Sequence, residues 1–282
     1  MVLITSIPQM AAINVHIGRR RIFRSDSAKH FDLSIPIDFD AEGLSAFGVP
    51  PASVQTVENA WFVGDTRRDG SCNVRVCQFI PHCHGTHTEC VGHIVDQDLS
   101  VTEILKDAWI PAVLVSVEPE QGVDCSESYI PGKEKDDALI TRRTLIERLK
   151  TLDDEDFQRA LVIRTLPNLP AKRTQRYVTA PYFSNEAMEE IVRRGVKHLL
   201  VDMPSVDRME DGGRLSNHRL FWEMPPGSHD LNRCKAPFRT ITEFIFAPDE
   251  AWDGYYLLNL QIAPFMGDAV PSRPLIFPVE AL

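Results

Sequence analysis

Residues 82 to 93 hold the densest group of side chains capable of metal chemistry in this sequence. Four of the nine histidines lie there, together with one glutamate and two cysteines, in the order HCHGTHTECVGH. Imidazole, thiolate and carboxylate groups are the ligands that zinc and its first-row neighbours prefer. Gly85 beside Thr86 would let the backbone turn several of them toward one point. The segment predicts a metal site, and the competing interpretation is a polar loop with a few core histidines.

A thiol hydrolase is a second chemical interpretation of the same segment. Cys83 or Cys90 could act as a covalent nucleophile, with His87 or His93 beside it as the base. That mechanism leaves the carboxylate of Glu89 without a role, whereas a metal site uses it as a ligand. The metal site is therefore the preferred interpretation.

The elements around this segment predict an α/β domain with a mixed β-sheet. Two alternating runs, 12–17 and 30–37, are typical of strands, and a hairpin formed by 61–63 and 74–80 would lead into the histidines. Helical and strand patterns then alternate, which favours a single layered domain. These later elements are a short helix at 101–106, a strand at 112–117, a helix capped by Thr141, a strand at 160–165, a helix from Ser184 to Gly195 and a strand at 196–201.

Composition excludes several classes of partner. The chain has 282 residues, 43% hydrophobic and 25% charged, with a formal net charge of -10. Nucleic-acid binding needs a concentrated basic surface, which this balance argues against. No run approaches the roughly 20 apolar residues of a membrane helix. The six cysteines show no CxxC spacing, and with no secretory leader this predicts a soluble, cytoplasmic protein with free thiols.

The histidine segment resembles the signature His-x-Gly-Thr-His-x-Asp-x-Pro-x-His of the cyclase or kynurenine-formamidase-like metal-dependent hydrolases. The matching stretch here is Cys83 to His93. The resemblance continues in DLSIP at 32–36, PYFSNEA at 181–187, VDMPSVD at 201–207 and the closing strands from Leu257 to Val279. It implies a cyclase-like domain over 30–282, with the family's swivelling β/β/α-like layers, preceded by an N-terminal extension over 1–29.

The same resemblance implies roles for individual residues. Cys83, His87, Glu89, His218 and Glu243 would bind the metal, and His93 would transfer the proton, with Glu243 able to share that role instead of ligating. Asp202 and Asp207 would either shape the pocket or serve as a cap and a turn.

This sequence departs from the family signature at three positions. Cys83 replaces the first histidine, Glu89 replaces the aspartate and Val91 replaces the proline. Cys83 alone keeps the spacing, but His82 or His84 could supply the missing imidazole through a shifted backbone. A set of thiolate, imidazole and carboxylate can hold Zn2+, and Mn2+ suits the carboxylates, so the identity and number of the metals stay open.

The resemblance implies an enzyme that cleaves C–N bonds other than peptide bonds, similar to arylformamidases and cyclases. It would use a metal-activated water to open an amide (a formyl-amide or cyclic amide) or a lactone of a small molecule. Family members usually form dimers or larger assemblies, so a homodimer or homotetramer is expected. The alternative is a non-catalytic relative whose metal site has eroded at Cys83 and Glu89, kept as a small-ligand-binding or structural protein. Neither interpretation names the substrate.

Overall fold

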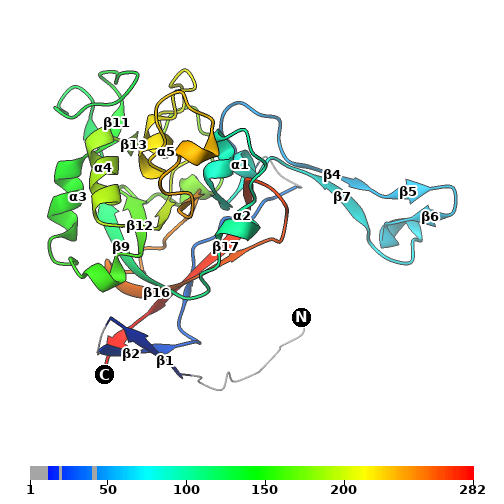
Figure 1. The fold of residues 1–282 in the computed structure, drawn as a ribbon. Coiled ribbons are helices and arrows are strands. Elements are labelled where there is room, and N and C mark those ends of the chain that lie inside the picture. Colours follow the sequence, from blue (N-terminus) through cyan, green and yellow to red (C-terminus); the bar gives the residue numbers. More distant parts are fainter. Residues whose placement is uncertain (1–11, 19–20, 40–42) are drawn as a thin grey trace.

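The centre of the molecule is an eight-stranded mixed sheet. The computed structural model describes residues 12–18, 21–39 and 43–282, so the start of the predicted N-terminal extension lies outside the described residues. The strand order is β16-β9-β12-β14-β15-β8-β17-β3. Because β16 also pairs with β17, seven of these strands close into a barrel-like ring and β3 is added at its edge. The predicted single α/β domain with a mixed sheet is confirmed (Figure 1).

Four neighbouring strands of the ring run parallel. They are β9 (Ile110–Val117), β12 (Ala160–Thr165), β14 (His198–Val201) and β15 (Thr240–Glu243). Their side chains are almost all buried, as expected for apolar strands covered on both faces. The predicted strands at 112–117, 160–165 and 196–201 are therefore confirmed, although the last begins at His198.

Two helices cover the outer face of the parallel strands (Figure 1). Helix α3 (Arg142–Leu149) begins after Thr141, whose side chain accepts a hydrogen bond from the Thr144 N–H. Helix α4 (Asn185–Arg193) begins after Ser184, which caps the Ala187 N–H in the same way, at 3.0 Å. The chain turns out of α4 at Gly195, with φ 75°, a conformation that favours glycine. These caps and the stop are all as predicted.

The ring is completed by antiparallel strands. Strand β8 (His87–Glu89) lies between β15 and β17 (Ala269–Pro278), antiparallel to both, and β16 (Gly254–Ile262) pairs with β17 and β9. The short helix α1 (Pro81–His84) precedes β8, and α2 (Val101–Ile104) follows it, where a helix was predicted. The histidine segment therefore enters the sheet in the middle of the ring.

Only part of the predicted strand at 30–37 forms a ladder. Strand β3 (Phe31–Asp32) pairs with β17. Beyond it the backbone bonds singly to three different segments: Leu33 N–H donates to Pro274 O, Phe246 N–H to Leu33 O, and Thr86 N–H to Ile35 O. This stretch connects the sheet edge with the histidine segment rather than extending one strand.

A ribbon of short strands projects from the body just before the histidine segment (Figure 1). Strand β4 (Ser53–Thr56) pairs with β7 (Arg75–Gln78), and β5 (Glu58–Asn59) pairs with β6 (Phe62–Val63). The prediction of a hairpin between 61–63 and 74–80 is wrong, because each run takes another partner. Strand β5 is nearer to β6 along the chain than the run 74–80 is. Closing this shorter connection costs less conformational entropy.

Smaller sheets complete the described structure. Strands β1 (Ala12–Ile17), where a strand was predicted, and β2 (Arg21–Asp26) form a hairpin that pairs with the last strand, β18 (Glu280–Ala281). Strands β10 (Glu120–Gln121), β11 (Ala138–Ile140) and β13 (Tyr182–Phe183) form another sheet, and α5 (Ser216–Phe221) packs against α4. Within the described ranges, the helices are all too short or too polar to cross a bilayer.

Candidate metal centre

The turn between α1 and β8 is held tightly against the rest of the fold. A side chain at Gly85 would place its Cβ 2.8 Å from Ile37 Cγ1 and 3.0 Å from Ile35 O, so no larger residue fits without a shift. The Thr86 hydroxyl accepts from the Ile35 N–H at 2.7 Å and donates to Phe244 O. These contacts fix the direction in which β8 enters the sheet and bury all three of its residues.

Strand register brings His87 opposite Glu243. The two are Cα partners in the antiparallel pairing of β8 with β15, and His87 Nε2 lies 3.4 Å from Glu243 Oε2. His87 Nδ1 donates to Gly85 O at 3.1 Å, so in the neutral ring Nε2 carries a lone pair. That nitrogen is buried and has no hydrogen-bond partner. An imidazole lone pair facing a carboxylate oxygen indicates a place for a cation.

Glu89 lies at the centre of the site and touches histidines on two sides. Its Oε1 accepts from His218 Nε2 at 3.0 Å, and its Oε2 lies 3.2 Å from His82 Nδ1. The geometry at Oε2 is not that of a hydrogen bond, and this buried oxygen has no hydrogen-bond partner. His218 Nε2 is also 3.8 Å from Glu243 Oε1. Four predicted residues, His87, Glu89, His218 and Glu243, thus converge, although they come from three separate stretches of chain.

His218 is aimed at Glu89 by a second carboxylate. Asp207 Oδ2 accepts from His218 Nδ1 at 2.6 Å, and Asp207 also accepts from the backbone N–H groups of Asn217 and His218 at the start of α5. The Tyr129 hydroxyl donates to Asp207 Oδ1 at 2.9 Å. Asp207 is therefore both a helix cap and the group that turns His218 Nε2 inward. Its partner in the sequence motif, Asp202, instead accepts from Lys172 Nζ at 2.8 Å and from the Thr165 N–H.

A second cluster lies on the other side of Glu89. The rings of His82 and His93 are 4.3 Å apart between centroids, and both face Asp268. His82 Nε2 is 3.0 Å and His93 Nδ1 is 3.4 Å from Asp268 Oδ2. Sequence reasoning did not select Asp268 or Tyr129, since both are single polar residues in loops with no motif around them.

Charge is strongly coupled across the centre. For His82, burial would lower the pKa, but the hydrogen bond to Asp268 and the neighbouring carboxylate of Glu89 outweigh it and raise the pKa to about 10. For His218, burial also would lower the pKa. The charge of Glu89 and the hydrogen bond to Asp207 outweigh this effect, so the pKa of His218 is well above its usual value. Burial would raise the pKa of Glu89, yet the charges of His93 and His218 hold it well below normal. The buried carboxylates thus favour positive charge at His82 and His218.

The segment also contains His84 and two cysteines, Cys83 and Cys90. His84 Nδ1 accepts from the Ile80 N–H at 2.9 Å and its Nε2 lies 2.9 Å from Pro50 O, so both ring nitrogens are used in local structure. Burial and the charge of Glu243 raise the pKa of the buried Cys83 thiol to about 11. Burial likewise raises the pKa of Cys90 to about 12. Both thiols are held in the protonated form, which does not favour the thiol-hydrolase interpretation.

Two overlapping groups have donor atoms close enough to hold a metal. His87, Glu89 and Glu243 form one, and His82, Glu89 and His93 form the other, each with all donor atoms within 4.8 Å of one another. Neither group contains Cys83, whose role as a ligand stays a prediction. The imidazole and carboxylate donors suit zinc and manganese. Two buried atoms without a hydrogen-bond partner, His87 Nε2 and Glu89 Oε2, belong to residues of these groups. The residues present therefore fit a divalent cation.

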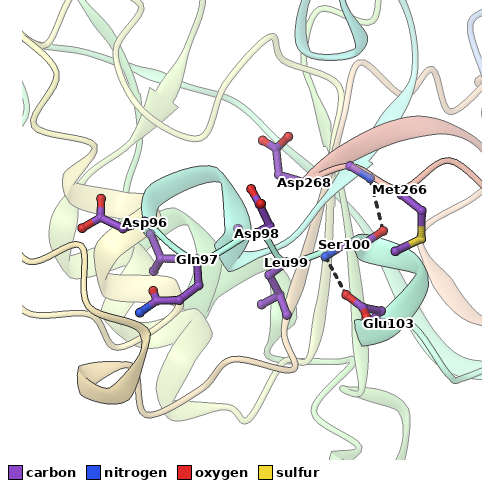
Figure 2. Close-up of a pocket in the computed structure, with 11 residues that line it drawn as sticks. Asp96, Gln97, Asp98, Leu99, Ser100, Glu103, Met266 and Asp268 are labelled. Atoms are coloured by element: carbon purple, nitrogen blue, oxygen red, sulfur yellow. Dashed lines mark hydrogen bonds between the residues drawn. The ribbon is translucent and has the colours of Figure 1, made fainter.

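A cavity of about 550 Å³ opens beside the second cluster. Figure 2 shows its lining, which comes from Gly92, from residues 95–100 with Glu103, and from the residues just before β17. Asp268 belongs both to this lining and to the contacts with His82 and His93. The lining includes the carboxylates of Asp96, Asp98, Glu103 and Asp268 and, within the described part of the chain, neither lysine nor arginine.

The fold and the site together define an α/β domain with a closed mixed sheet, whose buried histidines and carboxylates could hold a metal ion. The chain belongs to the putative cyclase family, whose model matches residues 31–208. The resemblance seen in the sequence is confirmed by this match. No curated protein sequence matches the chain.

Solved structures share this fold at low sequence identity. A predicted metal-dependent hydrolase from Bacillus stearothermophilus aligns with a TM-score of 0.56 at 15% identity, over 88% of this chain and 98% of its own. Isatin hydrolase A from Labrenzia aggregata, bound to benzyl benzoate, gives 0.54 at 14% identity, over 89% and 94%. Isatin hydrolase A from Ralstonia solanacearum gives 0.54 at 17% identity, over 88% and 91%. At these identities the likeness establishes the fold.

Proposed function

We propose that this chain is a metal-dependent hydrolase that opens an amide, either a formyl-amide or a cyclic amide, or a lactone of a small molecule. The observation that carries the proposal is the pair of buried, unpartnered atoms, His87 Nε2 and Glu89 Oε2, surrounded by further imidazole and carboxylate donors. Burying such groups without partners is costly, so their retention indicates a ligand that they bind together.

The proposed ligands of the principal cation are His87, Glu89, His218 and Glu243, with Cys83 as the fifth group predicted from the family signature. Zinc is the preferred ion and manganese the alternative. When bound, a divalent cation supplies Lewis-acid activation of a carbonyl group and of the attacking water. Glu243 is held in place as a ligand because its Oε1 accepts from the Val206 N–H at 3.0 Å while its Oε2 faces His87.

His93 is the proposed proton-transfer residue. Its side chain is 28% exposed, compared with 3% for His218, and it lies beside Asp268, which lines the cavity. Asp268 Oδ2 lies 3.4 Å from its Nδ1, where the carboxylate can orient the ring. Glu243 is a weaker candidate for the same role, because its two oxygens are already engaged. His93→Gln is expected to lower kcat by about 100- to 10,000-fold.

The substrate is proposed to be small and without negative charge. A cavity of about 550 Å³ is the size of a pocket for one small molecule. Its carboxylate lining would repel an anion and accept hydrogen bonds from an amide N–H. Two of the structures with this fold are named isatin hydrolases, which supports a cyclic amide as the first substrate to test.

Metal analysis and a substrate screen test the proposal together. Protein purified without chelator should contain at least one equivalent of zinc or manganese per chain, lost in His87→Ala and Glu89→Ala. Formyl-amides, lactones and cyclic imides are then screened with each metal restored, and His16→Ala, an exposed histidine on β1, is the matched control. A metal-free protein indifferent to chelator would support the non-catalytic alternative. Homo-oligomeric assembly and a cytoplasmic location stay predictions.

A further inference from the structure

Another cavity, of about 530 Å³, is formed by α4, α5 and the loop 225–227. Its lining residues, taken within the described chain, include none of the histidines and carboxylates of the metal centre. The volume is that of a pocket for one small molecule. Both of its arginines, Arg214 and Arg219, follow the stretch 31–208 that the family model matches, so the match assigns them no role.

Arg219 places a buried positive charge at the wall of this cavity. The residue is 7% exposed, and its hydrogen bonds go to backbone carbonyl groups. Its Nε donates to Arg214 O at 3.2 Å, and its Nη1 donates to Ser228 O at 2.7 Å and Pro225 O at 3.4 Å. Across the described residues no carboxylate pairs with it. Because a buried charge is costly unless it is paired, a bound anion would supply the missing partner.

The hydrogen bonds of Arg219 leave one nitrogen unused. A guanidinium group has five N–H donors, and the three carbonyl groups engage Nε and Nη1. Nη2 has no acceptor among the described residues. Arg214 is exposed at the same cavity, and its side chain likewise forms no hydrogen bond or ion pair within the described ranges. Two such guanidinium groups suit the oxygen atoms of a carboxylate.

The other polar side chains of the lining are nearly all satisfied within the protein. Asn185 Nδ2 donates to Ser216 Oγ at 2.9 Å, and Ser128 Oγ donates to Glu186 Oε1 at 2.8 Å. The exception is Glu189, an exposed carboxylate with no ion pair in the described part of the chain. One carboxylate and two guanidinium groups are thus left to face a ligand, which favours an anion with a single charge.

The remainder of the wall is apolar, which favours an organic anion over an inorganic one. Apolar ligand surface gains free energy when it is buried against apolar side chains, whereas a phosphate ion has no such surface. The apolar lining residues are Ile130, Pro131, Leu220, Met224 and Pro226.

A smaller cavity of about 450 Å³ adjoins this one, and Arg219 lines both. Its other basic side chains are Lys235 and Arg193, and Arg193 is already paired with Glu190 at 2.6 Å. The smaller cavity therefore offers an ammonium group, which acts as a point charge, where the larger one has the planar guanidinium of Arg214. The larger cavity is the better carboxylate site.

We propose that the cavity between α4, α5 and the loop 225–227 binds a small organic monocarboxylate. Its carboxylate accepts hydrogen bonds from Arg219 Nη2 and pairs with Arg214, and its apolar part lies against Leu220 and Met224. The inference goes beyond the proposed hydrolase site and does not depend on it, because the two sites share no residue.

The test follows the binding of para-fluorobenzoate to the full chain by fluorine NMR titration. Saturable binding is expected, and para-fluorobenzamide, which has the same shape without the charge, should bind at least about 10-fold more weakly. Inorganic phosphate at equal concentration should not displace para-fluorobenzoate. No saturable binding at millimolar concentration, equal binding of the amide, or displacement by phosphate would each overturn the inference.

Four variants locate the bound carboxylate. Arg219→Gln should weaken binding about 30-fold or more. Arg214→Glu should weaken it about 3- to 10-fold, and it keeps the test valid if Arg219→Gln does not fold, since Arg214 is exposed and its side chain holds no contact within the described residues. Lys235→Glu, the matched charge reversal at the smaller cavity, and His87→Ala, at the metal centre, should bind as the wild type does.

Two patterns among these variants would overturn the inference. Loss of binding in His87→Ala with full binding in Arg214→Glu would mean that the carboxylate binds at the metal centre. A loss in Lys235→Glu as large as that in Arg214→Glu would place the ligand in the smaller cavity or in the general field of the surface. Either result leaves the proposed hydrolase site standing, because metal content tests that site separately.

Discussion

Replacing Asp207 by asparagine tests how much of the metal affinity comes from a residue that does not face the centre. The Asp207 carboxylate accepts from His218 Nδ1 at 2.6 Å and from four further donors: the Tyr129 and Ser216 hydroxyls and the Asn217 and His218 N–H groups. Asparagine keeps the shape but loses the charge, and its amide nitrogen cannot accept. If that nitrogen faces Nδ1, the His218 ring must move its proton to Nε2, the atom that should bind the cation.

The expected loss has two separable parts. Removing such a carboxylate behind a metal-binding histidine costs about 10- to 100-fold in metal affinity, which corresponds to about 1.4–2.7 kcal/mol. The metal-free protein should also lose about 1–3 kcal/mol of unfolding free energy, because a buried N–H group that Asp207 satisfies is left without an acceptor.

Two measurements on Asp207→Asn separate these parts. Zinc affinity is measured by competition with a chromophoric chelator, and stability by urea unfolding of the metal-free protein. Tyr129→Phe is the matched control, since it removes one hydrogen bond to Asp207 and leaves the contact with His218 intact. Its zinc affinity should fall much less than that of Asp207→Asn. Wild-type zinc affinity in Asp207→Asn, together with reduced stability, would mean that Asp207 acts only as the cap of α5.

Three other perturbations are predicted from the same contacts. Gly85→Ala should cost about 1–3 kcal/mol in urea unfolding, because its Cβ would press on Ile35 O at 3.0 Å, and a neutral result would refute the tight packing of this turn. Burial lowers the pKa of His198 to about 4, although the Asp107 carboxylate acts in the opposite direction. As the pH falls below about 6.5, the unfolded chain therefore takes up this proton before the folded protein does, and the free energy of unfolding should fall by about 2 kcal/mol between pH 7 and pH 5. His198→Asn should abolish this part of the pH dependence. Zinc at 100 times its dissociation constant should stabilise the protein by about 2.7 kcal/mol, seen as a higher Tm that chelator reverses, and equal Tm values would contradict a folded-state metal site.

Local pattern predicted the elements of the parallel layer. The caps at Thr141 and Ser184 and the stop at Gly195 depend on side chains within a few residues of each helix end. Apolar runs identified the buried strands of the same layer, because burial on both faces leaves a continuous apolar pattern. Pairing was predicted less well, since the alternation that marks a strand does not say which strand lies beside it. The projecting ribbon shows this, with β6 and β7 each taking a partner other than the one expected.

The composition of the centre was visible in the sequence, since the histidine segment alone supplies four of the residues that meet there. Their arrangement was not, and the tertiary structure decided it in three ways. Strand register placed Glu243 opposite His87. The starting point of α1 turned His82 toward Glu89, and Asp268 joined it from 186 positions away along the chain. Spacing along a chain fixes side-chain direction only within one regular element, whereas contacts between elements depend on how the whole sheet closes.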